Sequence, residues 1–391
     1  MNQGAISEQC NLIEHMAMRF LDKNYPFAVR QKLIGSASGF CRDQWQETAE
    51  LGWMHLPVAE PIGDNGGVAD FVAVLMRVFG QHNYQSPYFA SAVVAAKIIE
   101  AMAEGAVRTD FLNQIADGTS IVSAALYEKQ SRFDLCNVLT SATESADGYM
   151  LQGSKVGVQY GNVATHLLIL ARTEASRPYC EGLSMFLVPK DLEGISLDHH
   201  RTHDGGRVSI VHLNNVATAH DSLIGSRDLA LAELRQALNF ALAMVCAEMV
   251  GVMDSTFTAV LEFVKTRSQF GSRIGSFQAI QHRLVDMYTR CELASSMGTE
   301  AIRAVNDLAG PDQDRLIAAA KAEVGRLATV NAEEAVHLHG AMGMMDEMPV
   351  GHFLKRVFAL NGLYGDAEYH QGRYRQLSQD QWIQRALPGV R

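Results

Sequence analysis

The segment 265–287 reads KTRSQFGSRIGSFQAIQHRLVDM and joins two stretches that have strong helical periodicity. Its middle, from Arg267 to Gln278, is a polar turn with two arginines, two glycines, three serines and two glutamines. A plain connection between two helices needs only a glycine and a few polar residues. The composition of this turn is therefore compatible with a binding role as well as with a purely connecting one.

The turn combines a forked cation, amides and a flat ring, which together suit a nucleotide diphosphate. Two glycines let the backbone approach a ligand, and Ser276 is expected to cap the next helix so that its N–H groups can face an anion. A capped turn with one solvated arginine is the alternative that the residues alone leave open. The residues concerned are Arg267, Gln269, Phe270, Gly271, Gly275 and Gln278.

Apolar residues on both sides of the turn recur every three or four positions. From Leu234 to Val264 they predict one long helix, and from Ile280 to Cys291 they open a second. Gly310-Pro311 separates a third helix, which Gly340 and Gly343 end. Long antiparallel helices with short connections form bundles, so residues 227–391 are predicted to be a C-terminal four-helix bundle domain.

The rest of the chain divides into two parts with different periodicities. Residues 1–119 read as an N-terminal helical domain that includes a turn-rich stretch at 56–67. Residues 120–226 contain short β-branched and aromatic runs separated by turn pairs, which predicts a middle antiparallel β domain. The fold class is therefore α+β. The predicted strands are SIVSAAL, YMLQGSKVGVQ, THLLILART, LSMFLVPK and VSIVHLNNV.

Composition narrows the class of function. The net charge is −10 without a basic block, which argues against nucleic acid or a membrane surface as partner. The six cysteines are widely spaced, so free thiols in a reducing cytoplasmic compartment are expected. Asp198, His199, His200 and His203 are interpreted as a solvated loop and not as a metal site, and Glu248 as a buried carboxylate with a structural partner.

The turn RSQFGSRIGSFQAIQHRLVDM resembles the flavin-binding segment of the acyl-CoA dehydrogenase family, and the resemblance covers nearly the whole chain. It implies the acyl-CoA dehydrogenase fold. Each supporting motif is weak alone, but their order and distances are specific. They are Leu-Gly-Trp at 51–53 with Gly-Gly at 66–67, Ile-Ala-Asp-Gly at 115–118, Asp-Gly-Tyr at 147–149, His-Gly-Ala-Met-Gly at 339–343 and Glu-Met-Pro-Val at 347–350.

In that family the turn binds the pyrophosphate and adenosine of FAD in a neighbouring subunit, and the glycine motif adds backbone contacts. The resemblance therefore implies FAD as cofactor and a dimer or a dimer of dimers. His337 stands where the family usually has a glutamine. Carried onto this chain, the cofactor-binding residues are Arg267, Gln269, Phe270, Gln278, His337, Gly340 and Ala341.

The family's reaction is the α,β-dehydrogenation of an acyl-CoA thioester, with a glutamate as the base that removes the α-proton. That glutamate falls here at Tyr364 or Gly365, and the other position used in the family falls at Ala241. None of these is a carboxylate. Asp366 is the nearest candidate for the base, and an N-cap for the helix that begins at Ala367 is the alternative.

The flavin-facing part of the β domain also departs from the family. The segment usually written Thr/Ser-Glu-Pro-Gly-x-Gly-Ser-Asp reads Tyr127 to Asp134 here, and it keeps Glu128 and Asp134 but has Phe133 before the aspartate. The Trp-Ile-Thr that borders the flavin reads Gly-Val-Gln at 157–159. The pyrophosphate half of the family's site is thus kept and the isoalloxazine half is rewritten.

With these departures the chain resembles the small or second subunits of bacterial two-component acyl-CoA dehydrogenases, which share the Gly-Asp-Ala-x-x-His string found here at 365–370. The implied partners are an acyl-CoA substrate, such as a bulky, dicarboxylic or steroid side-chain thioester, an electron-transferring flavoprotein as acceptor, and either a second copy or a second acyl-CoA dehydrogenase subunit. Two alternatives stay open: a non-catalytic subunit that completes a partner's flavin site, and different acyl-CoA chemistry with Asp366, Tyr364 or Tyr127 in new roles.

Overall fold

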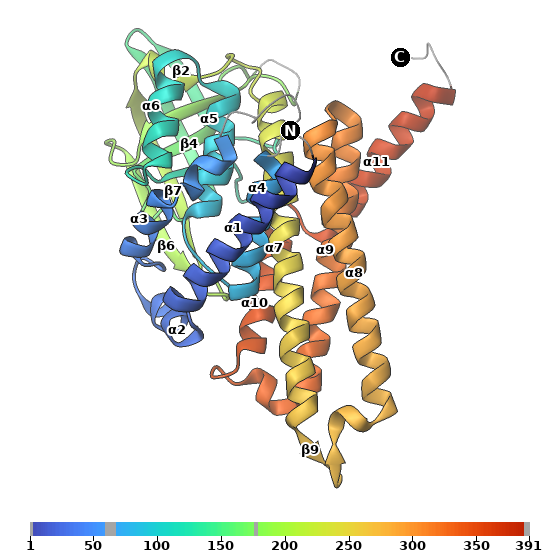
Figure 1. The fold of residues 1–391 in the computed structure, drawn as a ribbon. Helices are drawn as coiled ribbons and strands as arrows, with labels where there is room; N and C mark the ends of the chain where they lie inside the picture. Colours follow the sequence, from blue (N-terminus) through green and yellow to red (C-terminus); the bar gives the residue numbers. More distant parts are fainter. Residues whose placement is uncertain (1–2, 59–67, 176–178, 387–391) are drawn as a thin grey trace. The chain divides into compact units, whose positions relative to one another are not determined.

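The structure is a computed structural model that describes residues 3–58, 68–175 and 179–386 (Figure 1). Part of the turn-rich stretch, including the predicted Gly-Gly pair at 66–67, lies outside these residues. By its internal contacts the chain forms two compact units: Met1–Arg30, Pro61–Tyr84 and Leu242–Arg391 in the first, and Gln31–Glu60 and Gln85–Ala241 in the second. The division at residues 119 and 226 stays a prediction about domains.

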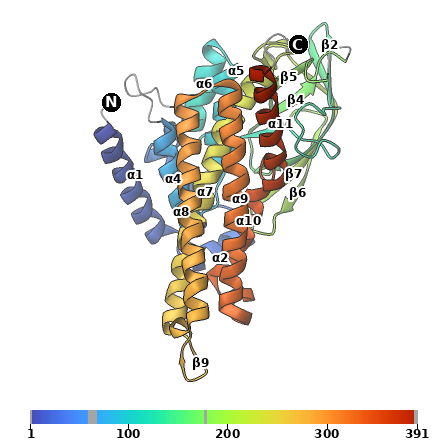
Figure 2. The ribbon, with the colours of Figure 1, turned by 90° about the vertical axis from the view of Figure 1, so that its right-hand side faces the viewer.

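The first unit is a helical bundle, as the periodicity predicts. Figure 2 shows α8 and α9 side by side along most of their length, with a small hairpin at the far end. Gly310 begins α9 and Gly340 follows its last residue, so both predicted boundaries are confirmed. The helices are α1 (Gln3–Asn24), α4 (Val68–His82), α7 (Leu231–Thr266) from Leu242 onward, α8 (Gln278–Asp307), α9 (Gly310–His339), α10 (Pro349–Gly362) and α11 (Ala367–Ala386).

Helices α4 and α7 cross in direct backbone contact because two glycines lie at the crossing. A Cβ atom built on Gly251 of α7 would lie 1.9 Å from the carbonyl oxygen of Arg77. A Cβ atom on Gly80 of α4 would lie 2.0 Å from the carbonyl oxygen of Glu248. Beside the crossing, the Arg77 guanidinium binds Asp254 at 2.8 Å. Any larger residue at either glycine must push the two helices apart.

Glu248 and Arg30 are charged side chains buried in the first unit, and both have partners. Glu248 is 1% exposed and accepts hydrogen bonds at 2.6 and 2.8 Å from the guanidinium of Arg356 on α10, which confirms its structural pairing. Arg30 donates to the carbonyl oxygen of Asn83 and to Nδ1 of His352. Burial and the adjacent Arg30 lower the pKa of His352, so this ring is held neutral as an acceptor.

The second unit is built around a sheet with strand order β6-β7-β3-β2-β4-β5-β8. Alternate residues of β3, β4, β5 and β7 point to one side and form its apolar core, in which Tyr149 and Phe186 pack edge to face at 5.0 Å. The strands are β1 (Val122–Ala125), β2 (Ser141–Ser145), β3 (Gly148–Gln159), β4 (His166–Arg172), β5 (Leu183–Pro189), β6 (Ile195–Arg201), β7 (Arg207–Thr218) and β8 (Leu223–Ile224).

This sheet is mixed and not purely antiparallel as the sequence predicts. Strand β1 pairs with β4 in parallel, with Val122 opposite His166. The chain between them contains the β2–β3 hairpin, which gives the long crossover that parallel strands require. The prediction that Asp198, His199 and His200 lie in a loop is also wrong, because these residues belong to β6 and pair with β7.

Helices of the second unit are tied to neighbouring helical segments and turns by hydrogen bonds from aromatic side chains. The indole Nε1 of Trp45 donates to the carbonyl oxygen of Gly118 at 2.9 Å, and the Tyr88 hydroxyl donates to that of Trp53 at 3.1 Å. The helices are α2 (Phe27–Gly35, which begins in the first unit), α3 (Arg42–Glu50), the 3-10 helix Trp53–Val58, the π-helix Phe89–Ala95, α5 (Ala96–Met102) and α6 (Gly105–Ala116).

The expectation that all six cysteines are free thiols is wrong. Cys136 and Cys180 form a disulfide that joins two loops of the second unit, although they are 44 residues apart in sequence. Spacing in sequence could not reveal this bond, because the sheet brings the two loops together. Cys10, Cys41, Cys246 and Cys291 are free.

Helix α7 is long and apolar enough by composition to cross a membrane. However, 94% of its most apolar window is buried inside the structure. Its hydrophobicity is therefore that of a core helix.

We expect Gly251→Ala to lower the free energy of unfolding by about 3 kcal/mol or more, because the new methyl group has no space at the α4–α7 crossing. Gly372→Ala is the matched control, since Gly372 is helical and has nothing within 4 Å of its ideal Cβ position. That variant should gain up to about 1 kcal/mol. Urea titration followed by circular dichroism measures both, and equal stability of the two variants would contradict the close crossing.

Candidate functional site

The predicted polar turn is a β-hairpin with a two-residue loop, and it projects from the end of the bundle (Figure 2). Strand β9 (Ser268–Gln269) pairs with β10 (Ser272–Arg273) in antiparallel register. Phe270 and Gly271 form the loop with φ of 52° and 78°. Two positive φ values are typical of a type I′ turn, a conformation that glycine adopts without strain and phenylalanine adopts rarely. The backbone thus places an aromatic ring at the tip at a conformational cost.

The side chains of this hairpin are exposed. Phe270 is 94% exposed, and its nearest aromatic neighbour is Phe277, with ring centroids 6.5 Å apart. Within the described part of the chain, the side chains of Arg267, Gln269 and Gln278 have no hydrogen-bond or ion-pair partner. An arginine with no carboxylate beside it retains all its donors for an external anion.

The predicted role of Ser276 as helix cap is wrong. Helix α8 begins at Gln278 with Phe277 in the N-cap position, and no side chain caps it. The Ser276 hydroxyl donates instead to the carbonyl oxygen of Arg273 at 2.7 Å, inside a short 3-10 turn. The first N–H groups of α8 are therefore not occupied by this serine, which keeps the positive end of the helix dipole available.

The glycine motif after α9 lies at the same end of the bundle. An apolar cluster joins the end of α7, the start of α8, the end of α9 and the start of α10, with Val264, Met287, Leu338 and Val350 among its members. Gly340 adopts φ of 62° and has nothing within 4 Å of an ideal Cβ position. Gly340 and Ala341 are both exposed, so the backbone here is open to a ligand.

His337 is held by its neighbours on the bundle surface. Arg283 of α8 donates to Nδ1 of His337 at 2.8 Å and also forms an ion pair with Glu334. Because Nδ1 accepts this bond, the donor of the neutral ring is Nε2–H. His339 two residues later is buried and stacks on Phe263 at 4.2 Å. His337 therefore offers a donor like the amide of the glutamine that the family usually has here.

These groups fit the phosphates and ring system of a dinucleotide. They supply an unpaired guanidinium, two free amides, a solvated aromatic ring and an open glycine backbone, all at one end of the first unit. In the described part of the chain these groups are exposed at the surface of the first unit.

The loop between α10 and α11 contains Tyr364 and Gly365, the positions at which the resemblance predicts the family's base. Tyr364 adopts φ of 54° and Gly365 φ of 117°, where a Cβ atom would meet the rings of Tyr369 and His370. Asp366 accepts a hydrogen bond from the backbone N–H of Tyr369 at 2.8 Å, which is the geometry of an N-cap. The alternative position Ala241 is fully buried in α7.

Two buried side chains fix this loop: Lys321, which the sequence pattern does not indicate, and His370, the last residue of the Gly-Asp-Ala-x-x-His string. The Lys321 ammonium, fully buried on α9, donates to the carbonyl oxygens of Asn361 and Gly365, both at 2.8 Å. Nε2–H of His370 donates to the carbonyl oxygen of Tyr364 at 3.0 Å. Burial lowers the pKa of Lys321 to about 8, and burial together with Lys321 and Arg373 lowers that of His370 to about 3. The imidazole is therefore neutral at pH 7.

In the second unit, Glu128 anchors the segment that faces the flavin in the family. Its carboxylate accepts hydrogen bonds from the backbone N–H groups of Leu139 and Thr140 and from the fully buried Lys155 ammonium at 2.8 Å. Burial alone would raise the pKa of Glu128, but Lys155 and the hydrogen bonds lower it to about 2. This carboxylate is a structural anion and not a proton acceptor near neutral pH.

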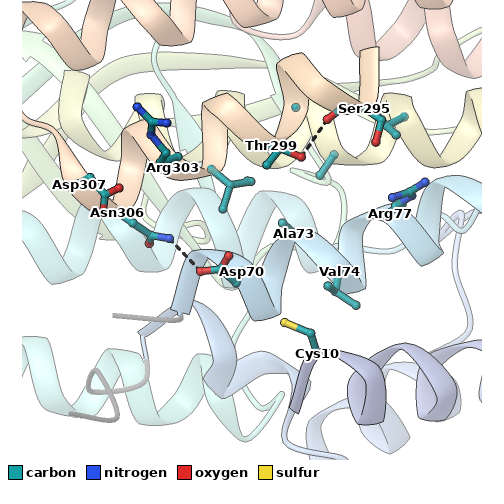
Figure 3. Close-up of a pocket in the computed structure, with 14 residues that line it drawn as sticks. Cys10, Asp70, Ala73, Val74, Arg77, Ser295, Thr299, Arg303, Asn306 and Asp307 are labelled. Carbon is teal, nitrogen blue, oxygen red and sulfur yellow. Dashed lines mark hydrogen bonds between the residues drawn. The ribbon is translucent and has the colours of Figure 1, made fainter. Parts of the chain in front are cut away.

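A pocket of about 390 Å³ lies elsewhere in the first unit, between α1, α4, α7 and α8 (Figure 3). Asp70 accepts a hydrogen bond from Asn306 at 2.8 Å, and Arg77 is paired with Asp254. Burial, Asp70 and Glu14 raise the pKa of the Cys10 thiol to about 11, so this thiol is unreactive. None of the predicted site residues lines the pocket.

Comparison with known proteins agrees with this geometry. The models for the middle domain and for the C-terminal domain of acyl-CoA dehydrogenases match residues 123–216 and 232–386. A probable acyl-CoA dehydrogenase, YngJ of Bacillus subtilis, is 25% identical over 355 residues, which are 90% of this chain and 92% of that protein.

Solved structures share the fold over nearly the whole chain. A variant of the steroid ACAD Tcur3481-Tcur3483 superposes with a TM-score of 0.85 at 24% identity, covering 97% of this chain and 99% of that one. The ChsE4-ChsE5 complex from Mycobacterium tuberculosis gives 0.81 at 22% identity, covering 96% and 97%. Family models over well over half of the sequence, together with this shared fold, establish that the chain belongs to the acyl-CoA dehydrogenase family.

Proposed function

We propose that this chain is an FAD-dependent acyl-CoA dehydrogenase or a component of one, which catalyses the α,β-dehydrogenation of an acyl-CoA thioester. The observation that carries the proposal is the exposed hairpin with the unpaired Arg267, in a chain that belongs to this family. The guanidinium binds the FAD pyrophosphate, and Phe270, Gln269 and Gln278 border the adenosine side. Gly340 and Ala341 contribute backbone contacts, and His337 contributes Nε2–H.

The hairpin supports a cofactor shared between subunits. Its side chains are exposed, and the hairpin projects from the end of its own unit, so they can contact FAD seated mainly in another subunit. FAD, when bound, supplies the hydride acceptor of the reaction. The protein residues supply phosphate binding, orientation and the exclusion of water.

A second candidate function is a non-catalytic subunit that completes the flavin site of a glutamate-bearing partner. We retain it because the resemblance puts the base at Tyr364, Gly365 or Ala241, none of which is a carboxylate, and because the nearby Asp366 caps a helix. Chains of this fold occur in a complex of two named proteins, ChsE4 and ChsE5. The proposed partners are accordingly a second acyl-CoA dehydrogenase subunit or a second copy, with an electron-transferring flavoprotein as acceptor, in the cytoplasm.

The visible spectrum of the purified chain separates the two functions. We expect a yellow protein with about one FAD per chain, which a suitable acyl-CoA bleaches under anaerobic conditions if the chain is catalytic. A non-catalytic subunit is instead colourless alone and becomes yellow and active only when it is co-expressed with a glutamate-bearing homologue. A chain that retains no flavin either alone or with such a partner would refute both.

Arg267→Gln should reduce the flavin-to-protein ratio of the assembled protein at least tenfold, since a neutral amide replaces a forked cation at the pyrophosphate. The absorbance ratio at 450 and 280 nm (about the flavin and protein maxima) measures this. Lys265→Gln is the control, because Lys265 is exposed nearby but already paired with Glu262 at 2.8 Å. Equal flavin loss in both variants would argue that only net charge matters.

The role of Asp366 as base is a hypothesis that two substitutions test against its capping role. Asparagine also caps helices well, so Asp366→Asn should keep the stability and the turnover, whereas Asp366→Ala should cost about 1 kcal/mol of unfolding free energy. Turnover and thermal unfolding are measured for both variants. A fall in turnover of about 100-fold in Asp366→Asn, with flavin retained, would assign the proton transfer to Asp366.

A further inference from the structure

A disulfide bond between Cys136 and Cys180 joins two loops of the second unit. Cys136 lies in the loop that connects the segment around Glu128 to β2, and Cys180 lies in the connection between β4 and β5. The two sulfur atoms differ in environment, because Cys136 is 3% exposed while Cys180 is an exposed residue. A thiol in solution therefore reaches the Cys180 side of the bond more easily.

Arg172 and Tyr179 hold the same two loops together beside the disulfide. The Arg172 guanidinium donates to the carbonyl oxygens of Cys136 and Val138 in one loop and to those of Tyr179 and Glu181 in the other. The Tyr179 hydroxyl donates to the Asp134 carboxylate at 3.0 Å. The bond therefore closes a small polar assembly at the surface, which its opening would loosen without exposing the apolar core.

A cation lies beside the buried sulfur. The guanidinium of Arg235 on α7 donates to Sγ of Cys136 at 3.9 Å. A neighbouring arginine stabilises a thiolate, and exchange is faster when the sulfur that leaves is the more stable thiolate. By contrast, burial raises the pKa of Cys246 to about 12 and that of Cys291 to about 11, so those two thiols are inert.

We propose that Cys136–Cys180 is an exchange-active bond through which cellular thiols modify this protein. A thiolate attacks Sγ of Cys180, the bond between the two sulfurs breaks, and Cys136 leaves as a thiolate next to Arg235. A second thiolate then attacks the small-thiol sulfur of the mixed disulfide on Cys180, and Cys180 leaves as a thiolate; both cysteine thiolates take up protons from water. Two electrons pass to the protein, which gains two thiols, while two small thiols become one disulfide. Glutathione, other low-molecular-weight thiols or a protein dithiol are the reductants.

The consequence for catalysis rests on the proposed function. The loop that Cys136 closes is continuous with Tyr127 to Asp134, the segment that faces the flavin in this family. The buried ion pair between Glu128 and Lys155 holds the start of that segment, whereas the disulfide at Cys136 holds the loop just after its end. Reduction leaves the ion pair of Glu128 in place and releases the loop around Cys136. It should therefore weaken the binding of acyl-CoA without unfolding the second unit.

The first experiment traps the intermediate. The purified protein is treated briefly with glutathione, quenched with iodoacetamide and analysed by peptide mass spectrometry. We expect the glutathione adduct on Cys180 and the carbamidomethyl group on Cys136, in at least about tenfold excess over the reverse pattern. An excess of the reverse pattern, equal adducts on both residues, or no disulfide before treatment would overturn the proposal.

The second experiment tests the cation. Arg235→Gln should slow reduction by glutathione at least about threefold, and Arg235→Lys should retain most of the rate. Arg227→Gln is the matched control, because Arg227 is an exposed arginine of the same unit that pairs with Glu144 instead. An unchanged rate in Arg235→Gln would remove Arg235 from the mechanism and refute the proposed direction of attack.

The third experiment measures whether the loop opens on reduction, by a method that does not depend on bound flavin. Amide hydrogen exchange should become at least about tenfold faster in residues 132–138 on reduction, while the strands β3 and β7 keep their protection. This readout needs no FAD or substrate, so it fails only if the loop does not open. The dissociation constant of acyl-CoA, compared in oxidised protein, reduced protein and Cys180→Ser, then tests the link to the proposed function alone.

Discussion

Apolar packing at one end of the bundle is the constraint on which the candidate site depends. Val264, Met287, Leu338 and Val350 come from four helices and meet in a single cluster. Because each of these helices ends or begins there, the chain must turn at the same place, and the turns carry Arg267, Gln278 and Gly340. The site residues are thus brought together by buried side chains that never contact a ligand.

Buried lysines perform the same task in both units. Lys155 holds a carboxylate that binds the backbone of one loop, and Lys321 binds the carbonyl oxygens of another loop directly. Burial lowers the pKa of each lysine to about 8. Each ammonium is costly to bury, and the hydrogen bonds of the loop compensate for that cost. Two loops near the proposed chemistry are therefore held by hydrogen bonds to buried side chains.

The sequence predicts features that follow from local periodicity and fails where distant segments meet. The bundle helices, the break at Gly310 and the end of α9 are read from spacing, and the structure confirms them. Spacing could not show that β1 pairs in parallel with β4, that Cys136 meets Cys180, or that Ser276 turns back to Arg273. Lys321 was overlooked because a lone lysine in an alanine-rich helix looks exposed. The prediction of FAD as cofactor and of the roles of the hairpin residues rests on the family resemblance and not on periodicity.

The interleaving of the two units in sequence has a consequence for how the protein is made. Helices α1 and α4 leave the ribosome early, yet their unit is completed by residues after Leu242. During synthesis these amphipathic helices must wait, with apolar faces exposed, until more than half of the chain has been made. We therefore expect a newly made chain to depend on chaperones until α7 appears, and no single truncation to release either unit as an independently folding fragment.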